Sequence, residues 1–157
     1  MLHDLRARGQ TLATAESLTA GLIAATVAAV PGASDVLRGG LAAYASDVKS
    51  TVLGVPADLL ASQGVISAGC ARAMATRARV VFEADWAVAA TGVAGPDAQE
   101  GKPVGTVYVA AAGPGVVRVQ QLDLTGTRQQ IRWSSVESAL SLLHDLLAVS
   151  PGRGGRG

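Results

Sequence analysis

The chain has 157 residues, a length that suits one domain with a substantial core and is too short for two. Its formal net charge is +1 with 16% charged residues, which argues against a surface that neutralises many nucleic-acid phosphates. Hydrophobic residues make up 49% of the chain, yet it contains only one Phe, two Trp and two Tyr. This composition predicts a compact α/β protein whose core is built from Ala, Val, Leu and Gly.

The cysteine content and the apolar segments exclude further classes. Cys70 is the single cysteine, so no internal disulfide is possible, and no Cys/His cluster has metal-ligand spacing. Residues 1–6 carry mixed charge and do not resemble a signal peptide. The longest apolar run, residues 22–30, is far shorter than the roughly 20 residues of a membrane helix. We therefore expect a cytoplasmic protein without a metal centre or a membrane segment.

The first half of the chain predicts short helices and two strands. A helix over residues 2–8 ends at Gly9, and a strand follows over residues 11–15. The next helix runs from about residue 19 to 30, where Pro31-Gly32 ends it. A strand is predicted over residues 41–44, and another helix begins near Ser46.

The second half predicts two helices, a strand, a hairpin and a last helix. Pro56 begins a short helix that Gly64 ends, and Ser67 caps a helix that runs to about residue 83. A buried strand over residues 86–90 leads into a glycine-punctuated loop. Strands over 104–112 and 116–124 form a hairpin, and a helix covers about 127–148.

This order of elements predicts a single-domain, three-layer α/β/α fold with a mixed sheet. The domain is expected to cover residues 1–149, followed by a disordered Gly/Arg-rich tail at 150–157. It is not a Rossmann domain, because no G-x-G-x-x-G follows the first strand.

Ser17 lies where the first predicted strand gives way to a helix. Backbone N–H groups at such a junction are free, and the helix dipole favours negative charge there. Ser17 is then either an N-cap, which the local pattern alone favours, or a nucleophile whose oxyanion the neighbouring amides hold.

A serine nucleophile needs a base, and the chain offers few. Neither His3 nor His144 lies where a Ser–His–acid arrangement would place it. Lys49 would lie in the first turn of a helix capped by Ser46, where the dipole and any burial lower the pKa of its ammonium. A neutral lysine there takes a serine proton. The alternative is an ordinary solvated lysine, which the position of Lys49 alone favours.

Four further features have two interpretations each. Tyr44, five residues before Lys49, either relays a proton or packs, and Asp47 is either a favourable first-turn acid or catalytic. The loop over residues 91–95 suits a phosphate- or amide-binding turn, although such loops are common. Arg128 begins the last helix and is either a phosphate ligand or a surface arginine.

Six motifs occur in order along the chain: Thr-Ala-Glu-Ser at 14–17, Tyr-Ala-Ser-Asp-Val-Lys at 44–49, Gly-Val-Ile-Ser at 64–67, Thr-Gly-Val-Ala-Gly-Pro at 91–96, Lys-Pro-Val-Gly-Thr-Val at 102–107 and Gly-Thr-Arg-Gln-Gln-Ile-Arg at 126–132. With this set, residues 2–148 resemble the CinA C-terminal domain family, the nicotinamide mononucleotide deamidases. No single motif is decisive, but the ordered set is highly specific.

The resemblance implies hydrolysis of the carboxamide of nicotinamide mononucleotide (NMN) to nicotinate mononucleotide and ammonia, in pyridine nucleotide salvage. It assigns Ser17 as the nucleophile, Lys49 as its base and Tyr44 as an assisting group. The implied substrate-binding residues are Thr19, Ala20 and Gly21 at the oxyanion, and Thr91, Gly92, Gly95 and Arg128 at the phosphoribosyl part. No metal or organic cofactor is implied, and the chain is expected to be a homo-oligomer, with a dimer favoured.

The sequence departs from the family pattern at three positions. The family usually has Cys-Thr-Gly-Gly after the serine, whereas residues 18–21 are Leu-Thr-Ala-Gly, and Ala20 restricts the backbone. Asp47 stands where the family often has Asn, and its charge would raise the pKa of Lys49. Ala98 replaces a frequent glycine. The chain also lacks the N-terminal domain of many CinA proteins, so we expect a stand-alone form.

Two other functions fit the same motifs. One is a nucleotide- or partner-binding module of this fold with weak or no turnover, which the changes at Ala20 and Asp47 favour. The other is an amidase for a different small amide, which needs only a changed pocket.

Overall fold

Five strands form one mixed sheet in the order β2-β1-β3-β4-β5. In this computed structural model, which describes residues 1–150, β1 (Leu12–Glu16) pairs in parallel with β2 (Leu37–Ala42) and with β3 (Trp86–Gly92). The strands β4 (Thr106–Gly113) and β5 (Val116–Asp123) form an antiparallel hairpin, and β4 also pairs antiparallel with β3. The predicted mixed sheet and its hairpin are therefore present.

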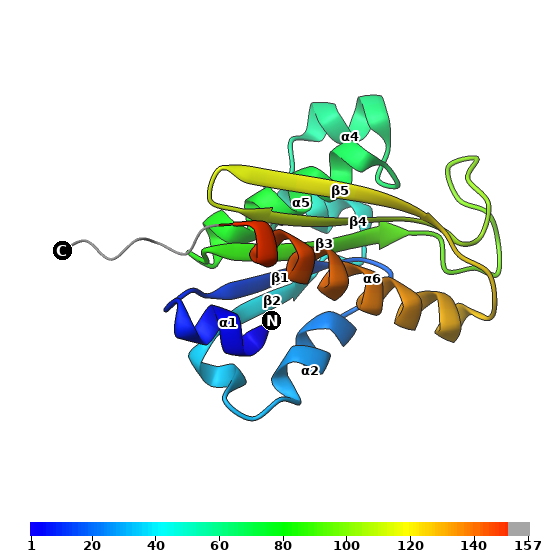
Figure 1. The fold of residues 1–157 in the computed structure, drawn as a ribbon. Coiled ribbons are helices and arrows are strands. Elements are labelled where there is room, and N and C mark those ends of the chain that lie inside the picture. Colours follow the sequence, from blue (N-terminus) through cyan, green and yellow to red (C-terminus); the bar gives the residue numbers. More distant parts are fainter. Residues whose placement is uncertain (151–157) are drawn as a thin grey trace.

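Helices cover both faces of this sheet. One face carries α1 (Leu2–Ala7), α2 (Leu22–Ala28) and the long α6 (Arg128–Val149). The other carries α5 (Ala68–Val81), together with α3 (Ser46–Thr51) and α4 (Ala57–Gln63); a short 3₁₀ turn, η1 (Ala33–Asp35), precedes β2. Figure 1 shows α6 crossing one side of the sheet and α5 lying on the other. The predicted three-layer α/β/α architecture is confirmed.

The two faces of the sheet differ in side-chain size. Toward α6, the central strands present large residues, including Leu12, Trp86, Val88, Val107 and Val109. Toward α5, the same strands present alanine at six positions: Ala13, Ala15, Ala87, Ala89, Ala110 and Ala112. This alternation follows the two-residue period of a strand. The small residues allow α5 to pack closely, as the alanine-rich composition indicated.

The strand β2 begins earlier than the sequence indicated. It runs from Leu37 to Ala42, and the pair Gly39-Gly40, expected before the strand, lies inside it. A Cβ on Gly40 would lie 2.2 Å from Thr14 Oγ1, and one on Gly39 would lie 2.8 Å from the ring of Phe82. These glycines allow close approach of neighbouring side chains rather than forming a turn.

The helix α2 begins later than expected, which leaves an irregular segment after β1. Its N-cap is Gly21, with φ of 97°, so residues 17–21 form a loop rather than a first helical turn.

At the other end of the chain, the Ser150 carbonyl accepts a hydrogen bond from Arg8 at 3.0 Å. The rest of the predicted tail, residues 151–157, lies outside the described residues. Within residues 1–150, no helix is long and apolar enough to cross a membrane.

Candidate functional site

A pocket of about 130 Å³ opens at the carboxyl ends of the three parallel strands. Ser17 follows β1, Tyr44 and Lys49 follow β2, and residues 91–95 end β3 and enter the next loop. Parallel neighbours bring their carboxyl ends to the same edge of a sheet, where such folds bind ligands. Seven predicted site residues line this pocket: Ser17, Tyr44, Lys49, Thr91, Gly92, Gly95 and Arg128.

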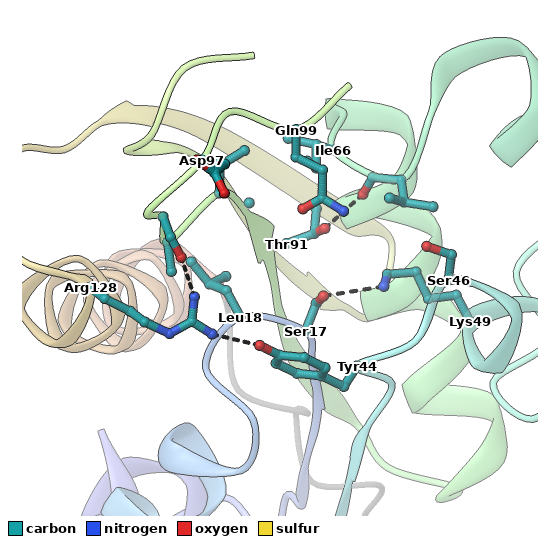
Figure 2. Close-up of a pocket in the computed structure, with 15 residues that line it drawn as sticks. Ser17, Leu18, Tyr44, Ser46, Lys49, Ile66, Thr91, Asp97, Gln99 and Arg128 are labelled. Carbon is teal, nitrogen blue, oxygen red and sulfur yellow. Dashed lines mark hydrogen bonds between the residues drawn. The ribbon is translucent and has the colours of Figure 1, made fainter. Parts of the chain in front are cut away.

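Ser17 and Lys49 are in direct contact at the base of this pocket. Lys49 Nζ donates a hydrogen bond to Ser17 Oγ at 3.2 Å and a second one to the Ala43 carbonyl at 3.0 Å (Figure 2). The Ser17 backbone N–H donates to the Ala90 carbonyl of β3 at 2.9 Å, which fixes the serine at the strand end. Because Gly21 is the N-cap of α2, Ser17 does not cap that helix.

Burial changes the acid–base chemistry of Lys49. Its side chain is 1% exposed, and no carboxylate of the described residues lies within 4.0 Å of Nζ. Loss of hydration lowers the pKa of this ammonium below the ordinary value of 10.5, while Cys70 and Glu100 act in the opposite direction. Burial raises the pKa of the Cys70 thiol to about 11. Because a thiol with that pKa is neutral near pH 7, Glu100 is the negative group that opposes the shift there.

The cause of this pKa shift differs in part from the one expected. The helix α3 has six residues and Lys49 lies in its last turn, so the positive end of a helix dipole does not face it. Ser46 is the first helical residue rather than the cap, which is Ala45. Asp47 is exposed and is not among the groups that shift the Lys49 pKa. Burial is thus the main cause.

Arg128 connects two sides of the pocket mouth. It is the first residue of α6, as predicted, and Nη2 donates to the Tyr44 hydroxyl at 2.6 Å. Its Nη1 donates to the Gly95 carbonyl (Figure 2). Tyr44 is 55% exposed, and its hydroxyl makes no hydrogen bond with Ser17 or Lys49 in this geometry. The guanidinium therefore holds the tyrosine against the loop that follows β3.

The end of β3 forms another wall of the pocket. The buried Thr91 hydroxyl donates to the Val65 carbonyl at 2.7 Å, which ties β3 to the segment before α5. At Gly92, an added Cβ would lie 2.6 Å from the Thr106 carbonyl oxygen, so the close approach of β4 requires glycine. This wall is thus shaped by backbone contacts more than by free hydroxyls.

The three residues predicted to hold the oxyanion do not line the pocket. The Ala20 N–H donates to the Ser17 carbonyl at 3.0 Å, and the Gly21 N–H donates to Glu16 Oε2 at 2.9 Å. Both donors are therefore already engaged. Thr19 is fully buried, and its N–H and that of Leu18 have no acceptor among the described residues. Of the three predicted residues, Thr19 alone keeps a free N–H among the described residues, but Leu18, which was not predicted, is the free donor that lines the pocket.

Glu16 was not singled out from the sequence, yet it organises the loop over residues 17–21, which begins with Ser17. Its carboxylate is 1% exposed and accepts hydrogen bonds from the backbone N–H groups of Gly21, Ile23 and Ala24, each at 2.9 Å. A fourth bond comes from the Thr14 hydroxyl at 3.0 Å. A carboxylate is well placed at a helix N-terminus. An acidic residue ending a buried strand just before a helix was the available signal.

Glu100 is a second residue that the sequence did not indicate. Its carboxylate accepts hydrogen bonds from the backbone N–H groups of Val65 and Ile66, both at 3.0 Å. Val65 and Ile66 line the pocket, so this exposed glutamate holds one of its walls. No local motif reveals such a contact, because the partners are 34 and 35 residues apart.

Neither histidine of the chain contributes to this pocket. His3 and His144 are both exposed and neither lines it. Across residues 1–150, no group of three or more His, Cys, Asp or Glu side chains is arranged to hold a metal ion. The hydroxyl and the amine that the geometry brings together at this pocket are those of Ser17 and Lys49.

The fold is that of a known family. The model of the CinA C-terminal domain matches residues 1–147, and the chain belongs to that family. A CinA-like protein of Frankia casuarinae is 46% identical over 144 residues, and one of an Anaeromyxobacter species is 49% identical over 140. These alignments cover 92% and 88% of this chain but 33% and 34% of the relatives, so the chain spans about a third of their length.

Solved structures give the same relationship in three dimensions. The competence damage-inducible protein A of Klebsiella pneumoniae superimposes with a TM-score of 0.91 at 32% identity, covering 95% of this chain and 93% of that one. A competence/damage inducible protein of Agrobacterium tumefaciens gives a TM-score of 0.88 at 35% identity, with 92% and 90% covered. The chain is similar to these proteins over nearly its whole described length.

Proposed function

We propose that this chain is an amidase that hydrolyses the carboxamide of NMN to nicotinate mononucleotide and ammonia. The single observation that carries the proposal is the hydrogen bond between Ser17 and the buried Lys49, which lacks a carboxylate partner in the described residues. A lysine whose pKa is lowered by burial supplies a neutral amine, which is the form that removes a proton from a serine. The nicotinamide nucleotide as substrate comes from the family resemblance.

The reaction has two halves. In the first, Lys49 Nζ takes the Ser17 proton while Ser17 Oγ attacks the amide carbon and forms a tetrahedral oxyanion. The amide C–N bond then breaks, the nitrogen takes the proton back from Lys49, and ammonia leaves an acyl-ester on Ser17. In the second half, Lys49 takes a proton from water, hydroxide attacks the ester, and Ser17 regains its proton as the nicotinate nucleotide departs.

The free N–H group of Leu18, which lines the pocket, is the donor we assign to the oxyanion. A donor on the residue after the nucleophile is well placed to meet charge that develops only in the transition state. Tyr44 and Arg128 are assigned to the substrate. The Tyr44 hydroxyl accepts a bond from Arg128 and makes none with Ser17 or Lys49, so a proton relay through it requires the tyrosine to move closer to them. A role for the pair at the nucleotide, with the loop over residues 91–95, is more consistent with their position at the pocket mouth.

Ammonia release from NMN by the purified protein tests this function. We expect turnover by the wild type and a loss of about a thousandfold or more in kcat for Ser17→Ala and for Lys49→Ala. Ser62→Ala, an exposed serine on α4, is the matched control and should retain full activity. Mass spectrometry of acid-quenched enzyme should find the acyl group on Ser17.

Three outcomes would contradict the proposal in different ways. If both site variants keep wild-type turnover, the mechanism is wrong even though the activity is present. If calorimetry detects NMN binding but no ammonia is released, the chain is a nucleotide-binding module of this fold. If ammonia is released from other small amides instead, the substrate assignment is wrong.

A further inference from the structure

Arg132 makes an unusual contact with the loop that carries the nucleophile. It lies on α6, one turn after Arg128, and does not line the pocket. Its Nε donates to the Leu18 carbonyl at 2.8 Å, and its Nη2 donates to the Thr19 carbonyl at 3.1 Å. One guanidinium thus holds two consecutive peptide carbonyls directly after Ser17. Within residues 1–150, no carboxylate lies within 4.0 Å of it.

This contact fixes the direction of backbone N–H groups as well as carbonyls. In a trans peptide the C=O and the N–H of one unit point in opposite directions. Holding the Leu18 carbonyl toward α6 therefore turns the Thr19 N–H away from α6. In the preceding unit, the Ser17 carbonyl accepts from the Ala20 N–H at 3.0 Å, which turns the Leu18 N–H away from that bond. These two N–H groups are the free donors of the loop.

The loop has no regular secondary structure to hold this arrangement. Residues 17–21 lie between the end of β1 and the beginning of α2 at Leu22. Glu16 anchors the far end of the loop at Gly21, but it makes no bond with the peptide units at 17–19. Among side chains of the described residues, Arg132 is the one that holds the carbonyls of Leu18 and Thr19.

We propose that Arg132 is a positioning residue that holds the two peptide carbonyls after Ser17, and that it thereby keeps the Leu18 N–H group directed at the oxyanion. This inference rests on the proposed function. Arg132 does not touch the substrate in this assignment; it acts through the backbone of the nucleophile loop. Pre-orientation of such donors stabilises the transition state more than the bound substrate, so its loss reduces kcat and leaves KM nearly unchanged.

The experiment compares Arg132→Lys and Arg132→Met with the wild type and with Arg118→Met, an exposed arginine on β5. Lysine keeps the charge but has no planar fork for two carbonyls, whereas methionine removes every donor. We expect kcat for NMN to fall about 10-fold for Arg132→Lys and about 100-fold for Arg132→Met, with KM within about threefold of wild type. Arg118→Met should match the wild type.

A purely structural role predicts a different pattern. It would reduce activity in proportion to the folded fraction, which circular dichroism at the assay temperature measures. A third variant, Arg132→Ala, removes the guanidinium group, and free guanidinium at millimolar concentration should restore part of its kcat. The same addition should leave Ser17→Ala inactive. If the Arg132 variants keep wild-type kcat, or if their loss of kcat equals their loss of folded protein, the inference is overturned.

A second readout separates this inference from the proposed function. A fluorophosphonate probe phosphonylates an activated serine with loss of fluoride, and its P=O oxygen occupies the oxyanion position. If the wild type does not turn over NMN but the probe labels Ser17, the substrate assignment fails alone. Slower labelling of Arg132→Lys and Arg132→Met would then still support the role of Arg132. Equal labelling rates, or no labelling of the wild type, would overturn it.

Discussion

Lys49 Nζ lies 3.2 Å from Ser17 Oγ, and within residues 1–150 it makes one other hydrogen bond, to the Ala43 carbonyl. A buried amine with neutral partners costs less to deprotonate than a solvated one, because its ammonium form has lost the hydration that water provides. The relationship therefore combines proximity to the nucleophile with a tendency toward the neutral, basic form.

The pH dependence of kcat/KM should report the ionisation of Lys49. Because the neutral amine is the base, activity should rise with pH until Lys49 is deprotonated, with a midpoint below the ordinary value of 10.5. Lys49→Arg keeps a cation that does not deprotonate, so we expect no rising limb and a loss of about a thousandfold or more. Lys102→Arg, the other lysine, should keep the wild-type profile. A flat wild-type profile would contradict this assignment.

Lys49 should also reduce the stability of the fold near neutral pH. The variant Lys49→Met has a similar side-chain length and no charge to bury, so its free energy of unfolding at pH 7 should exceed the wild-type value by about 1 kcal/mol. Because the folded pKa is lowered, the unfolded chain binds more protons between that pKa and 10.5, and wild-type stability rises with pH there. The gain from Lys49→Met should shrink over the same window in urea titrations.

Glu100 should influence the pH profile from outside the pocket. Its negative charge raises the pKa of Lys49, so Glu100→Gln should lower that pKa further and move the rising limb of kcat/KM to lower pH. Since Glu100 is exposed, the displacement should decrease at high salt. Gln has one carbonyl oxygen for the two N–H groups of Val65 and Ile66, so we also expect KM to increase a few-fold. Glu83→Gln, an exposed matched change, should do neither.

Glu16→Gln should be among the most destabilising single substitutions near the site. The carboxylate receives four hydrogen bonds in a buried position, and a glutamine amide would direct its own NH2 toward some of those donors. We expect a loss of about 2 to 3 kcal/mol in the free energy of unfolding, measured by urea denaturation. Glu137→Gln on the exposed side of α6 should change stability by less than about 0.5 kcal/mol. Equal effects of Glu16→Gln and Glu137→Gln on the free energy of unfolding would mean that the four hydrogen bonds to Glu16 contribute little to stability.

Ala20→Gly tests the position where the loop departs from the family pattern. Ala20 has φ of 50°, a left-handed conformation that costs alanine about 1 kcal/mol and glycine almost nothing. We expect a modest gain in thermal stability, on the order of 2 °C, without a change in NMN turnover. The same substitution in a helix, Ala25→Gly in α2, should be destabilising by about 0.5 to 1 kcal/mol. If Ala20→Gly instead lowers the thermal stability, the left-handed backbone of Ala20 does not cost the protein stability.

The fold was largely predictable from local signals. Gly64 ends α4, Ser67 caps α5 by accepting the Cys70 N–H, and Thr127 caps α6, so these boundaries follow from residue chemistry at the helix ends. The start of β2 was not predictable, because Gly39 and Gly40 are required by Phe82 and Thr14, which lie far away in sequence. A glycine pair in a strand and one in a turn have the same local appearance.

The site was predictable in its membership more than in its electrostatics. The family resemblance implied that Ser17 and Lys49 act together, although the local pattern of each residue favoured another role, and the structure brings them into contact. From the sequence, the pKa shift of Lys49 was expected to come partly from a helix dipole. Because Lys49 lies in the last turn of the six-residue helix α3, the positive end of that dipole does not face it, and burial is the main cause. Glu100 and Arg132 act through contacts 34 or more residues apart in sequence, which no local motif reveals, whereas the position of Glu16 between a buried strand and a helix was a usable signal.

The loop over residues 17–21 is held by two side-chain anchors, the carboxylate of Glu16 and the guanidinium of Arg132. For protein engineering, this means that the smallest unit worth grafting onto another scaffold is larger than the loop. It includes β1, the first turn of α2 and one arginine from a crossing helix. A graft without that arginine would carry the serine but leave the shape of its surroundings to chance.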